Sequence, residues 1–330
     1  MTKYHIDING VPAICRAEII ACPRGGGQEH YSTKEEAQVY ADFLNETEAR
    51  LGLRDFIINN KEITSEDAKK RAQEVENIIR NPLIERFNTK RFYYNPVVEE
   101  WDEERAKLHN EIINEFLNEY ENVPSDKKVI ISAGLPGAGK TTVLGKIPEI
   151  NISEYAIVNS DDIKEKMVEK GMIPEIRGLT PLESAGLIHE ESSYLADKLQ
   201  IELSKRGKNT IYDMTSKSRS SVKRRLAVFQ NRGYNIKDVT MVFVDIDIET
   251  SKERANDRYR DGLNDYIQGK SIMGGRYIPK SVFETCRPTW KDTSSINQEV
   301  FKTIKMDKSF PIKTIEYRNN IYGEEPKRIY

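Results

Sequence analysis

The sequence has 330 residues, of which 38% are hydrophobic and 32% are charged, and its mean hydropathy is −0.65. The 51 basic and 53 acidic residues leave a net charge of −2, which argues against a broad nucleic-acid-binding surface. No apolar run is long enough to cross a membrane, the N-terminus lacks a secretory h-region, and three cysteines are too few for a disulfide framework. We therefore expect a cytoplasmic protein.

The first part of the chain is predicted to be a turn-rich segment, 1–32, followed by a mostly helical region, 33–122. Ser32 and Thr33 are both candidates to cap a helix that runs to residue 51, and acidic residues follow them in the first turn. A second helix, predicted over 64–80, opens with the same arrangement. Capping residues thus predict where both helices begin.

The end of the helical region is predicted from a proline and from an apolar stripe. Pro82 is expected to end the second helix, and 81–96 is expected to be a connector. A long charged helix is predicted over 97–123. Its apolar stripe consists of Trp101, Leu108, Ile112, Phe116 and Leu117. We interpret the stripe as a face packed on the next domain, the alternative being a groove for a partner.

The third region, 123–330, alternates apolar runs with helical patterns. Strands are predicted at 127–133, 154–160, 208–214 and 238–246, with a possible fifth at 311–319. Helical patterns lie between them, notably over 181–205 and 220–232. This alternation predicts an α/β domain with a parallel sheet covered on both faces, and ligands then bind at the carboxyl ends of the strands.

A phosphate-binding loop follows the first of these strands. The sequence "GLPGAGKTT" consists of Gly134, Leu135, Pro136, Gly137, Ala138, Gly139, Lys140, Thr141 and Thr142, and it fits the P-loop pattern between a strand and a helix. Its glycines let backbone N–H groups approach phosphate oxygens, Lys140 is expected to reach the β- and γ-phosphates, and Thr141 is expected to bind Mg²⁺. ATP and Mg²⁺ are therefore the predicted ligands, the alternative being a glycine-rich turn that arose by chance.

A P-loop is shared by kinases, GTPases, motors and nucleotide-gated switches. The guanine-reading N-K-x-D pattern of GTPases is absent from the sequence, and no long ATPase module follows the loop. The remaining length suits a small kinase core. The sequence thus predicts a P-loop kinase-type fold, in which a parallel sheet is the middle of three layers.

Two strand ends that contain aspartates are candidates for binding the molecule that accepts the phosphate. Asp161 and Asp162 follow the second strand, where a carboxylate would face the γ-phosphate and accept the proton of a substrate hydroxyl. The alternative is that one of them caps the next helix. Asp213 and Thr215 lie at the end of the third strand, where Asp213 would bind a substrate hydroxyl or orient a magnesium-bound water. The alternative is a turn aspartate and a capping threonine.

Arginines on a predicted lid come next. Arg254, Arg258 and Arg260 lie at helical spacing, and a segment with flexible glycines then supplies Arg276. Such arginines can close over a triphosphate and neutralise the charge that develops during transfer. The alternative is a basic face exposed to solvent.

Six segments, taken in order, resemble the zeta-toxin family of P-loop kinases. The resemblance covers about residues 125–290 and rests on "GLPGAGKTT", "IVNSDDIK", "HEESSYLADKL", "NTIYDMTS", "VDIDIETSKERANDRY" and "GGRYIPKSV". It implies an enzyme that transfers phosphate from ATP to the 3′-hydroxyl of a UDP-N-acetylhexosamine or to a similar small acceptor. It also implies roles for single residues: Lys140 and Thr141 as the P-loop pair, Asp161 as the catalytic base, and Arg258 and Arg276 as contacts to the triphosphate. Asp213, Thr215 and Glu190 are assigned to the substrate side.

The sequence departs from the family pattern on the acceptor side. Asp213-Met214-Thr215 stands where the best-known toxins have a Glu-Gly-Thr turn, and the His-Pro pair often found after the catalytic aspartate is missing. The acceptor is therefore predicted only by its class, a nucleotide-like small molecule such as a nucleotide sugar. No antitoxin partner follows from the sequence. Two alternatives remain. The first is a polynucleotide 5′-hydroxyl kinase, which would need a basic channel, and 222–226 is the only compact basic run in the kinase region that could contribute to one. The second is a nucleotide-gated interaction module without turnover.

The first thirty residues resemble the start of uncharacterised actinobacterial and phage proteins. They contain four of the seven Cys and His residues of the chain, namely His5, Cys15, Cys22 and His30. Four such ligands can complete a tetrahedral zinc site, although the spacing is not that of a standard finger and no C-x-x-C pair is present. The alternative is that small buried cysteines and a glycine turn pack on the helices.

Overall fold

The computed structural model describes every residue except 1, 18–21, 23–29, 322–323 and 330. It divides into two compact units, each made of three separate segments of the chain. The first unit comprises Met1–Ala106, Lys164–Glu191 and Arg258–Tyr277; the second comprises Lys107–Ile163, Ser192–Asp257 and Ile278–Tyr330. Four helices begin in one unit and end in the other, namely α6 (Glu103–Glu119), α8 (Ser160–Glu169), α9 (His189–Lys205) and α11 (Ile248–Ile267).

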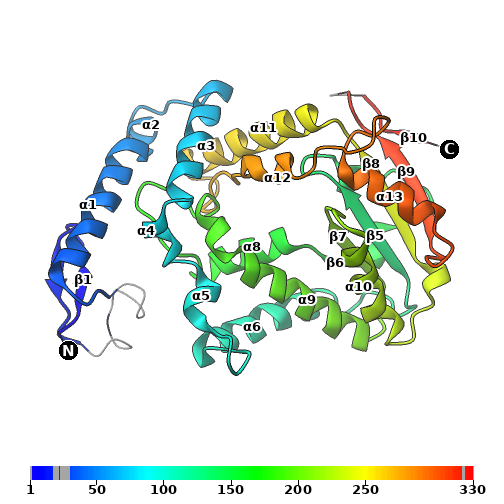
Figure 1. Ribbon diagram of the computed structural model, residues 1–330, viewed down its shortest axis with the longest axis horizontal. Helices are drawn as coiled ribbons and strands as arrows, with labels where there is room; N and C mark the ends of the chain where they lie inside the picture. The colour runs from blue at the N-terminus through cyan, green and yellow to red at the C-terminus, as the bar shows by residue number, and fades with distance from the viewer. Residues whose placement is uncertain (1, 18–21, 23–29, 322–323, 330) are drawn as a thin grey trace. The chain divides into compact units, whose positions relative to one another are not determined.

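The first unit combines two small hairpins with short and medium helices (Figure 1). Its remaining elements are β1 (Tyr4–Ile6), β2 (Pro12–Ile14), α1 (Lys34–Leu51), α2 (Arg54–Ile58), α3 (Ser65–Ile79), α4 (Pro82–Glu85), α5 (Thr89–Tyr93), β3 (Tyr94–Asn95), β4 (Glu100–Trp101) and the 3-10 turn η4 (Ser184–Ile188). Strand β1 pairs antiparallel with β2, and β3 pairs with β4 in the same way. The N-terminal segment therefore contains a hairpin, beyond the turns that its sequence predicts.

The two capped helices begin where the sequence predicts. The side chain of Thr33 accepts a hydrogen bond from the backbone N–H of Glu36 at the start of α1. Thr64 and Asp67 form a complete capping box at the start of α3, in which each side chain accepts from the other residue's backbone N–H. Helix α3 ends at Ile79, before the proline, as predicted.

The predicted connector after α3 is more ordered than expected. It contains α4 and α5, because Asn81 and Asn88 each cap a short turn with their side-chain oxygen. The long helix predicted from residue 97 begins instead at Glu103. Asp102 accepts a hydrogen bond from the backbone N–H of Arg105 at 3.1 Å and so caps α6, which leaves Trp101 in β4. The helical part of the predicted stripe is buried at Ile112, Phe116 and Leu117.

A buried ion pair joins the three segments of the first unit. Arg71 of α3 donates to both carboxylate oxygens of Glu183, at 2.6 and 2.8 Å, and to the carbonyl of Gly178 at 2.9 Å. Tyr259 of α11 donates its hydroxyl to the same carboxylate. Burial by itself would lower the pKa of Arg71, but the Glu183 carboxylate outweighs it and raises that pKa; burial, followed by Glu183, raises the pKa of Tyr259.

The second unit is built on a six-stranded sheet in the order β10-β9-β8-β5-β7-β6. Its remaining elements are β5 (Val129–Gly134), α7 (Lys140–Leu144), η3 (Ile152–Glu154), β6 (Ala156–Val158), β7 (Thr210–Met214), α10 (Arg219–Gln230), η5 (Ile236–Asp238), β8 (Thr240–Asp245), α12 (Lys280–Glu284), α13 (Ile296–Met306), β9 (Lys313–Arg318) and β10 (Lys327–Ile329). All neighbours pair in parallel except β10, which runs antiparallel to β9. The five predicted strands and the α/β fold are confirmed, whereas α12, α13 and β10 were not predicted.

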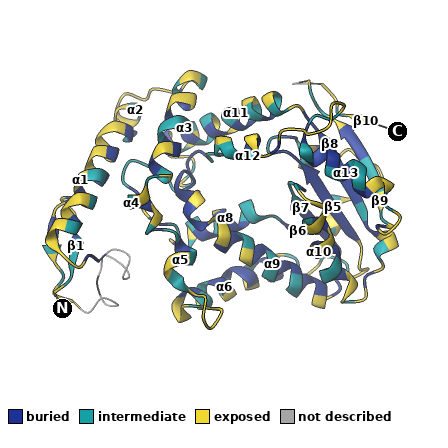
Figure 2. Ribbon diagram, in the orientation of Figure 1, coloured by how far each residue is buried: buried dark blue, intermediate teal, exposed yellow. Residues whose placement is uncertain are grey.

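Helices cover both faces of this sheet. Val242 and Val244 of β8 belong to a buried cluster with Val143 and Leu144 of α7. The intervening Phe243 points to the other face and stacks on Phe301 of α13, with the ring centroids 5.0 Å apart. All six residues of the central strand β5 are buried, as Figure 2 shows by its dark blue colour. The sheet is therefore the middle of three layers, which explains its nearly continuous apolar strands. Within the described part of the chain, every helix is too short or too polar to cross a membrane.

Candidate active site

The phosphate-binding loop connects β5 to α7 in the second unit. Gly137 and Gly139 have φ values of 72° and 77°, and Gly139 directly precedes α7, which begins at Lys140. Only glycine adopts such values without strain, so these positions let consecutive backbone N–H groups point to one side. Helix α7 has only five residues, so its dipole adds little, and we expect the loop N–H groups and Lys140 to supply most of the positive potential.

Close packing is a second reason for the glycines. A Cβ atom at Gly134 would lie 2.6 Å from the carbonyl oxygen of Val244, and one at Gly139 would lie 2.7 Å from the side-chain nitrogen of Asn319. A Cβ atom at Gly137 would lie 3.2 Å from the Cβ of Arg254. The loop is therefore confined by β8, by the chain after β9 and by α11.

Two side chains that the sequence did not single out hold the loop in place. Asn319, directly after β9, donates its side-chain amide to the carbonyl of Ala138 at 2.8 Å. Ser251 of α11 donates its hydroxyl to the carbonyl of Pro136 at 2.5 Å. These bonds use loop carbonyls and no loop N–H group, although the N–H of Ala138 donates to the carbonyl of Leu135 at 3.2 Å. The one available signal for Asn319 was its position at the carboxyl end of the fifth predicted strand.

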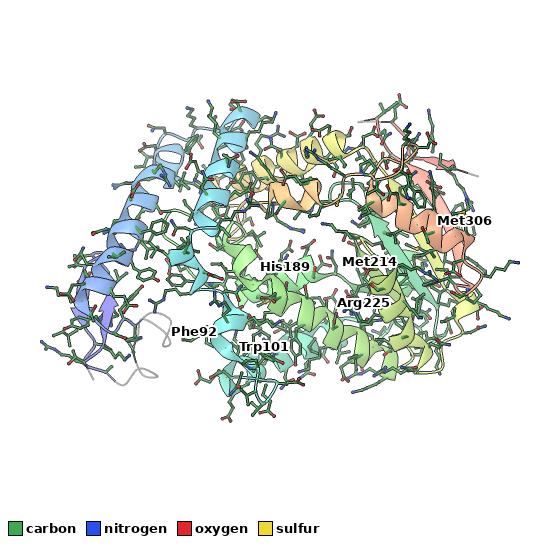
Figure 3. All side chains as sticks on the ribbon, in the orientation of Figure 1. Phe92, Trp101, His189, Met214, Arg225 and Met306 are labelled. Atoms are coloured by element: carbon green, nitrogen blue, oxygen red, sulfur yellow. The ribbon has the colours of Figure 1, made fainter. Side chains whose placement is uncertain are left out.

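Lys140 and Asp213 lie next to each other at the carboxyl edge of the sheet. The Lys140 ammonium is 3.7 Å from an oxygen of Asp213 and 3.4 Å from the carbonyl oxygen of Gly134. Asp213 is in β7, paired beside Ser132 of β5, and both charged side chains are mostly buried. Met214, labelled in Figure 3, ends that strand. The carbonyl of the next residue, Thr215, accepts a hydrogen bond from the side chain of Asn297 in α13.

Asp161 lies in the first turn of α8, directly after β6. The cap of this helix is Asn159, whose side-chain oxygen accepts a hydrogen bond from the backbone N–H of Asp161 at 3.0 Å. The amide of Asn159 in turn donates to Asp162 at 3.2 Å. The alternative role for Asp161 or Asp162 was to cap this helix. Asn159 is the residue that caps it. Both aspartates are half-buried.

Strand register places these groups along one edge. Ile131 of β5 pairs beside Tyr212 of β7, and Tyr212 pairs beside Val158 of β6. All three strands run in the same direction, so the P-loop, Asp213 and Asp161 follow one another across the same edge. Neighbouring strands are about 4.8 Å apart, so the ends of β5 and β6, which lie on either side of β7, are about 10 Å apart.

Tyr212 does not add a titrating group to this edge. Burial raises its pKa, although the Arg225 guanidinium, 4.7 Å from the ring centroid, acts in the opposite direction. The phenol therefore stays protonated at neutral pH. Asp213 and Asp161 are the carboxylates that the sequence assigns to a substrate or to Mg²⁺ at these two strand ends.

Three further predicted site residues belong to the first unit, namely Arg258, Arg276 and Glu190. Arg258 is exposed on α11, and Arg276 is half-buried in the segment that follows. Arg260 donates to the Ser65 hydroxyl at 2.7 Å and contacts Asp261. Glu190, at the start of α9, is half-exposed and pairs with Lys90 at 3.1 Å. The predicted contacts of Arg258 and Arg276 with a triphosphate, and of Glu190 with a substrate, stay predictions.

Two of the three glycines of the predicted lid, Gly274 and Gly275, pack closely within the first unit. A Cβ atom at Gly274 would lie 2.2 Å from the side chain of Thr180, and one at Gly275 would lie 2.5 Å from the carbonyl oxygen of Tyr259. Both glycines are buried, and the carbonyl of Met273 accepts from the backbone N–H of Leu182 at 2.9 Å. At Gly274 and Gly275 the lack of a side chain allows a close approach of the backbone, whereas a Cβ atom at Gly269 would meet nothing within 4 Å. The flexibility of this segment stays a prediction.

A family model described as "Zeta toxin" matches residues 114–322. Among solved structures, a chain of the AvrRxo1-ORF1:AvrRxo1-ORF2 complex is similar in a crystal with sulphate ions and in one with ATP. Each has a TM-score of 0.50, with 16% and 15% identity, and the match covers 69% of this chain and 67% of that chain. A chain from the PezAT chromosomal toxin–antitoxin system of the human pathogen Streptococcus pneumoniae has 15% identity and a TM-score of 0.45, and covers 68% of this chain and 79% of that chain. At these identities the solved structures bear on the fold alone.

Proposed function

Because the chain belongs to the zeta-toxin family and is therefore an ATP-dependent kinase, we propose that its acceptor is a hydroxyl of a UDP-N-acetylhexosamine or a similar nucleotide-like molecule, with Asp161 as the base. The observation that carries the proposal is the order of groups along the carboxyl edge of β5, β7 and β6. The phosphate loop, Asp213 and Asp161 lie there in sequence, all within the second unit.

The donor side consists of the phosphate loop and Lys140. Backbone N–H groups of the loop bind the phosphates, and the Lys140 ammonium reaches the β- and γ-phosphate oxygens. Mg²⁺ supplies positive charge to the β- and γ-phosphates, and the exposed hydroxyl of Thr141, in the first turn of α7, is the oxygen ligand that suits it. Asp213, beside Lys140, suits a magnesium-bound water or a substrate hydroxyl.

The acceptor side depends on Asp161. Its carboxylate takes the proton of the substrate hydroxyl, and the hydroxyl oxygen forms a bond to the γ-phosphorus. The bond between that phosphorus and the β,γ-bridging oxygen breaks, and ADP leaves with the bonding electrons. Because Asn159 caps α8, the Asp161 carboxylate is not required for the cap.

A polynucleotide acceptor is the less favoured alternative because its basic run is partly committed elsewhere. Arg225, within 222–226, is mostly buried, forms an ion pair with Asp197 and lies over the ring of Tyr212. Figure 3 labels Arg225 on α10. Only Lys223 and Arg224 of that run are exposed, which is a small surface for binding a phosphate backbone.

The test is a transfer assay with γ-labelled ATP, Mg²⁺ and the full chain. UDP-N-acetylglucosamine, UDP-N-acetylgalactosamine and a 5′-hydroxyl oligonucleotide serve as acceptors. We expect label on a UDP-sugar, a loss of at least about 100-fold in Asp161→Asn with ATP affinity nearly unchanged, and activity retained in the matched control Asp162→Asn. A fully active Asp161→Asn would refute the assigned base. Label on the oligonucleotide alone would establish the alternative acceptor, and ATP binding without turnover of any acceptor would favour an interaction module.

A further inference from the structure

Four potential metal ligands converge in the N-terminal part of the first unit. Ligand atoms of His5, Cys15, Cys22 and His30 all lie within 4.8 Å of one another. Cys22 and His30 are buried, and His5 and Cys15 are half-buried. None of these four residues is among those proposed for phosphate transfer, so the cluster is independent of the proposed function.

The backbone brings three of the four ligands together. His5 is in β1 and pairs beside Ala13 of β2, so that Cys15 follows directly after the paired strand. The N–H of Cys15 donates to the carbonyl of Lys3 at 2.8 Å. On the other side, Tyr4 and Tyr31 exchange two backbone hydrogen bonds of 3.0 and 2.7 Å, which places His30 next to the hairpin. These residues are therefore ordered by main-chain pairing, whatever their side chains bind.

The distances match those between ligands of a tetrahedral zinc ion. The Cys22 sulfur lies 3.4 Å from Nδ1 of His5, and the Cys15 sulfur lies 3.2 Å from Nε2 of His30. With zinc–sulfur bonds of about 2.3 Å and zinc–nitrogen bonds of about 2.0 Å, tetrahedral geometry separates sulfur from nitrogen by about 3.5 Å. The two imidazoles meet edge to face, with centroids 5.9 Å apart, so both rings can direct a nitrogen to a common centre.

The chemistry of this set favours zinc. We propose that His5, Cys15, Cys22 and His30 bind one Zn²⁺ ion as a structural site of the first unit. Two thiolates and two neutral imidazoles make the site neutral, which suits its partial burial, and binding releases the two thiol protons to solvent. Four protein ligands leave no open position for a substrate, so the ion has a structural role.

Contacts around His30 link this site to the helices. The His30 carbonyl accepts a hydrogen bond from Arg86 at 3.0 Å, and the Arg86 guanidinium lies 4.3 Å from the ring centroid of Tyr31. Arg86 also pairs with Glu36 of α1 at 3.4 Å. Loss of zinc is therefore expected to loosen the packing of the hairpin on α1. A disulfide between Cys15 and Cys22 is the competing chemistry, although both residues are thiols in the structure.

The test is metal analysis of the full chain, purified without chelator. We expect about one zinc per chain in the wild type and in the control Cys286→Ser, whose cysteine is buried in the second unit, and less than about 0.2 in Cys15→Ser and Cys22→Ser. Cobalt substitution should give thiolate charge-transfer and tetrahedral d–d absorption in the wild type but not in Cys22→Ser. A chelator should lower the melting temperature of the wild type and leave that of Cys22→Ser unchanged.

Several outcomes would overturn the site. A wild-type chain that stays free of zinc after reconstitution under reducing conditions would do so, as would a cobalt spectrum unaffected by Cys22→Ser. A Cys15–Cys22 disulfide, detected by mass spectrometry of the protein as purified, would show that these cysteines are oxidised and do not bind a metal. The zinc content and the disulfide analysis of the wild type test the proposed zinc site even if a cysteine variant misfolds.

Discussion

The ammonium of Lys140 lies 3.7 Å from the carboxylate of Asp213, and this ion pair connects the phosphate-binding loop to the end of the neighbouring strand. The contact places the residue expected to bind the phosphates of ATP beside a carboxylate suited to Mg²⁺ or a substrate. It forms because β5 and β7 are adjacent and parallel, so that their carboxyl ends meet at one edge.

Replacing Lys140 should remove phosphate transfer without unfolding the protein. We expect Lys140→Ala to lower kcat/KM by about 100-fold or more, because a positive charge at the transferring phosphate is lost. Turnover of γ-labelled ATP measures the effect. The control is Lys146→Ala, which removes a lysine whose exposed partner is Glu325 and should leave activity within about twofold. Equal losses in the two variants would contradict the assignment.

Asn319 should affect ATP binding through the loop. Asn319→Ala removes the hydrogen bond to Ala138, and a net loss of about 0.5–1.5 kcal/mol corresponds to about a 2- to 10-fold weaker ATP affinity. Calorimetric titration with ATP measures it. The neighbouring Asn320 accepts from the N–H of Asp247 instead, so Asn320→Ala is the matched control and should bind ATP normally. Unchanged affinity in Asn319→Ala would show that the loop does not need this bond.

The sequence predicted the parts of the site that follow from local pattern. The P-loop residues and the two strands ending near Asp161 and Asp213 were found because glycine spacing and apolar runs are local signals. Asn319 and Ser251 were missed because they act over long sequence separations, through side-chain bonds that leave no periodic trace. The capping role of Asn159 was missed because the adjacent aspartates are equally good caps.

The buried pair of Arg71 and Glu183 should stabilise the first unit. We expect Glu183→Ala to reduce the free energy of unfolding by about 3–5 kcal/mol, because it leaves the Arg71 charge buried without a carboxylate. Chemical denaturation followed by circular dichroism measures this. Lys70→Ala breaks an exposed pair with Glu66 on the same helix and should cost less than about 0.5 kcal/mol. A loss below about 1 kcal/mol in Glu183→Ala would mean that the unit relaxes around the vacated site.

The capping box of α3 should make stability depend on acidity. The hydroxyl of Thr64, followed by its backbone N–H, donates to Asp67 and lowers the pKa of that carboxyl below its ordinary value of 3.8. The folded state thus favours the charged carboxylate. The stabilisation is complete above the ordinary pKa and is lost as pH falls through the lowered value.

Asp67→Asn should accordingly be less stable than the wild type at neutral pH, and the difference should shrink at low pH. Denaturant titrations at a series of pH values measure it. Glu66→Gln, in the same turn but outside the capping box, is the control and should change stability by less than about 0.5 kcal/mol throughout. A difference for Asp67→Asn that stays constant down to the acid limit would contradict the pKa argument.

The division of the chain into two units could not be predicted from local pattern. Hydrophobic periodicity finds α11, but it does not indicate that Tyr259 from its second half packs with Glu183 and with Arg71 of α3. The shift of the start of α6 to Glu103 was equally hidden, since Asp102 is one of many acidic residues there. Apolar stripes report which face is buried and leave the identity of the neighbour open.

The bond between Asn319 and Ala138 also has a consequence for synthesis of the chain. The phosphate loop leaves the ribosome first, and its partner is made 181 residues later. At about 5–20 residues per second, the loop waits roughly 10–40 s for this support. A nascent kinase of this kind therefore completes its ATP site only after β9 has been synthesised.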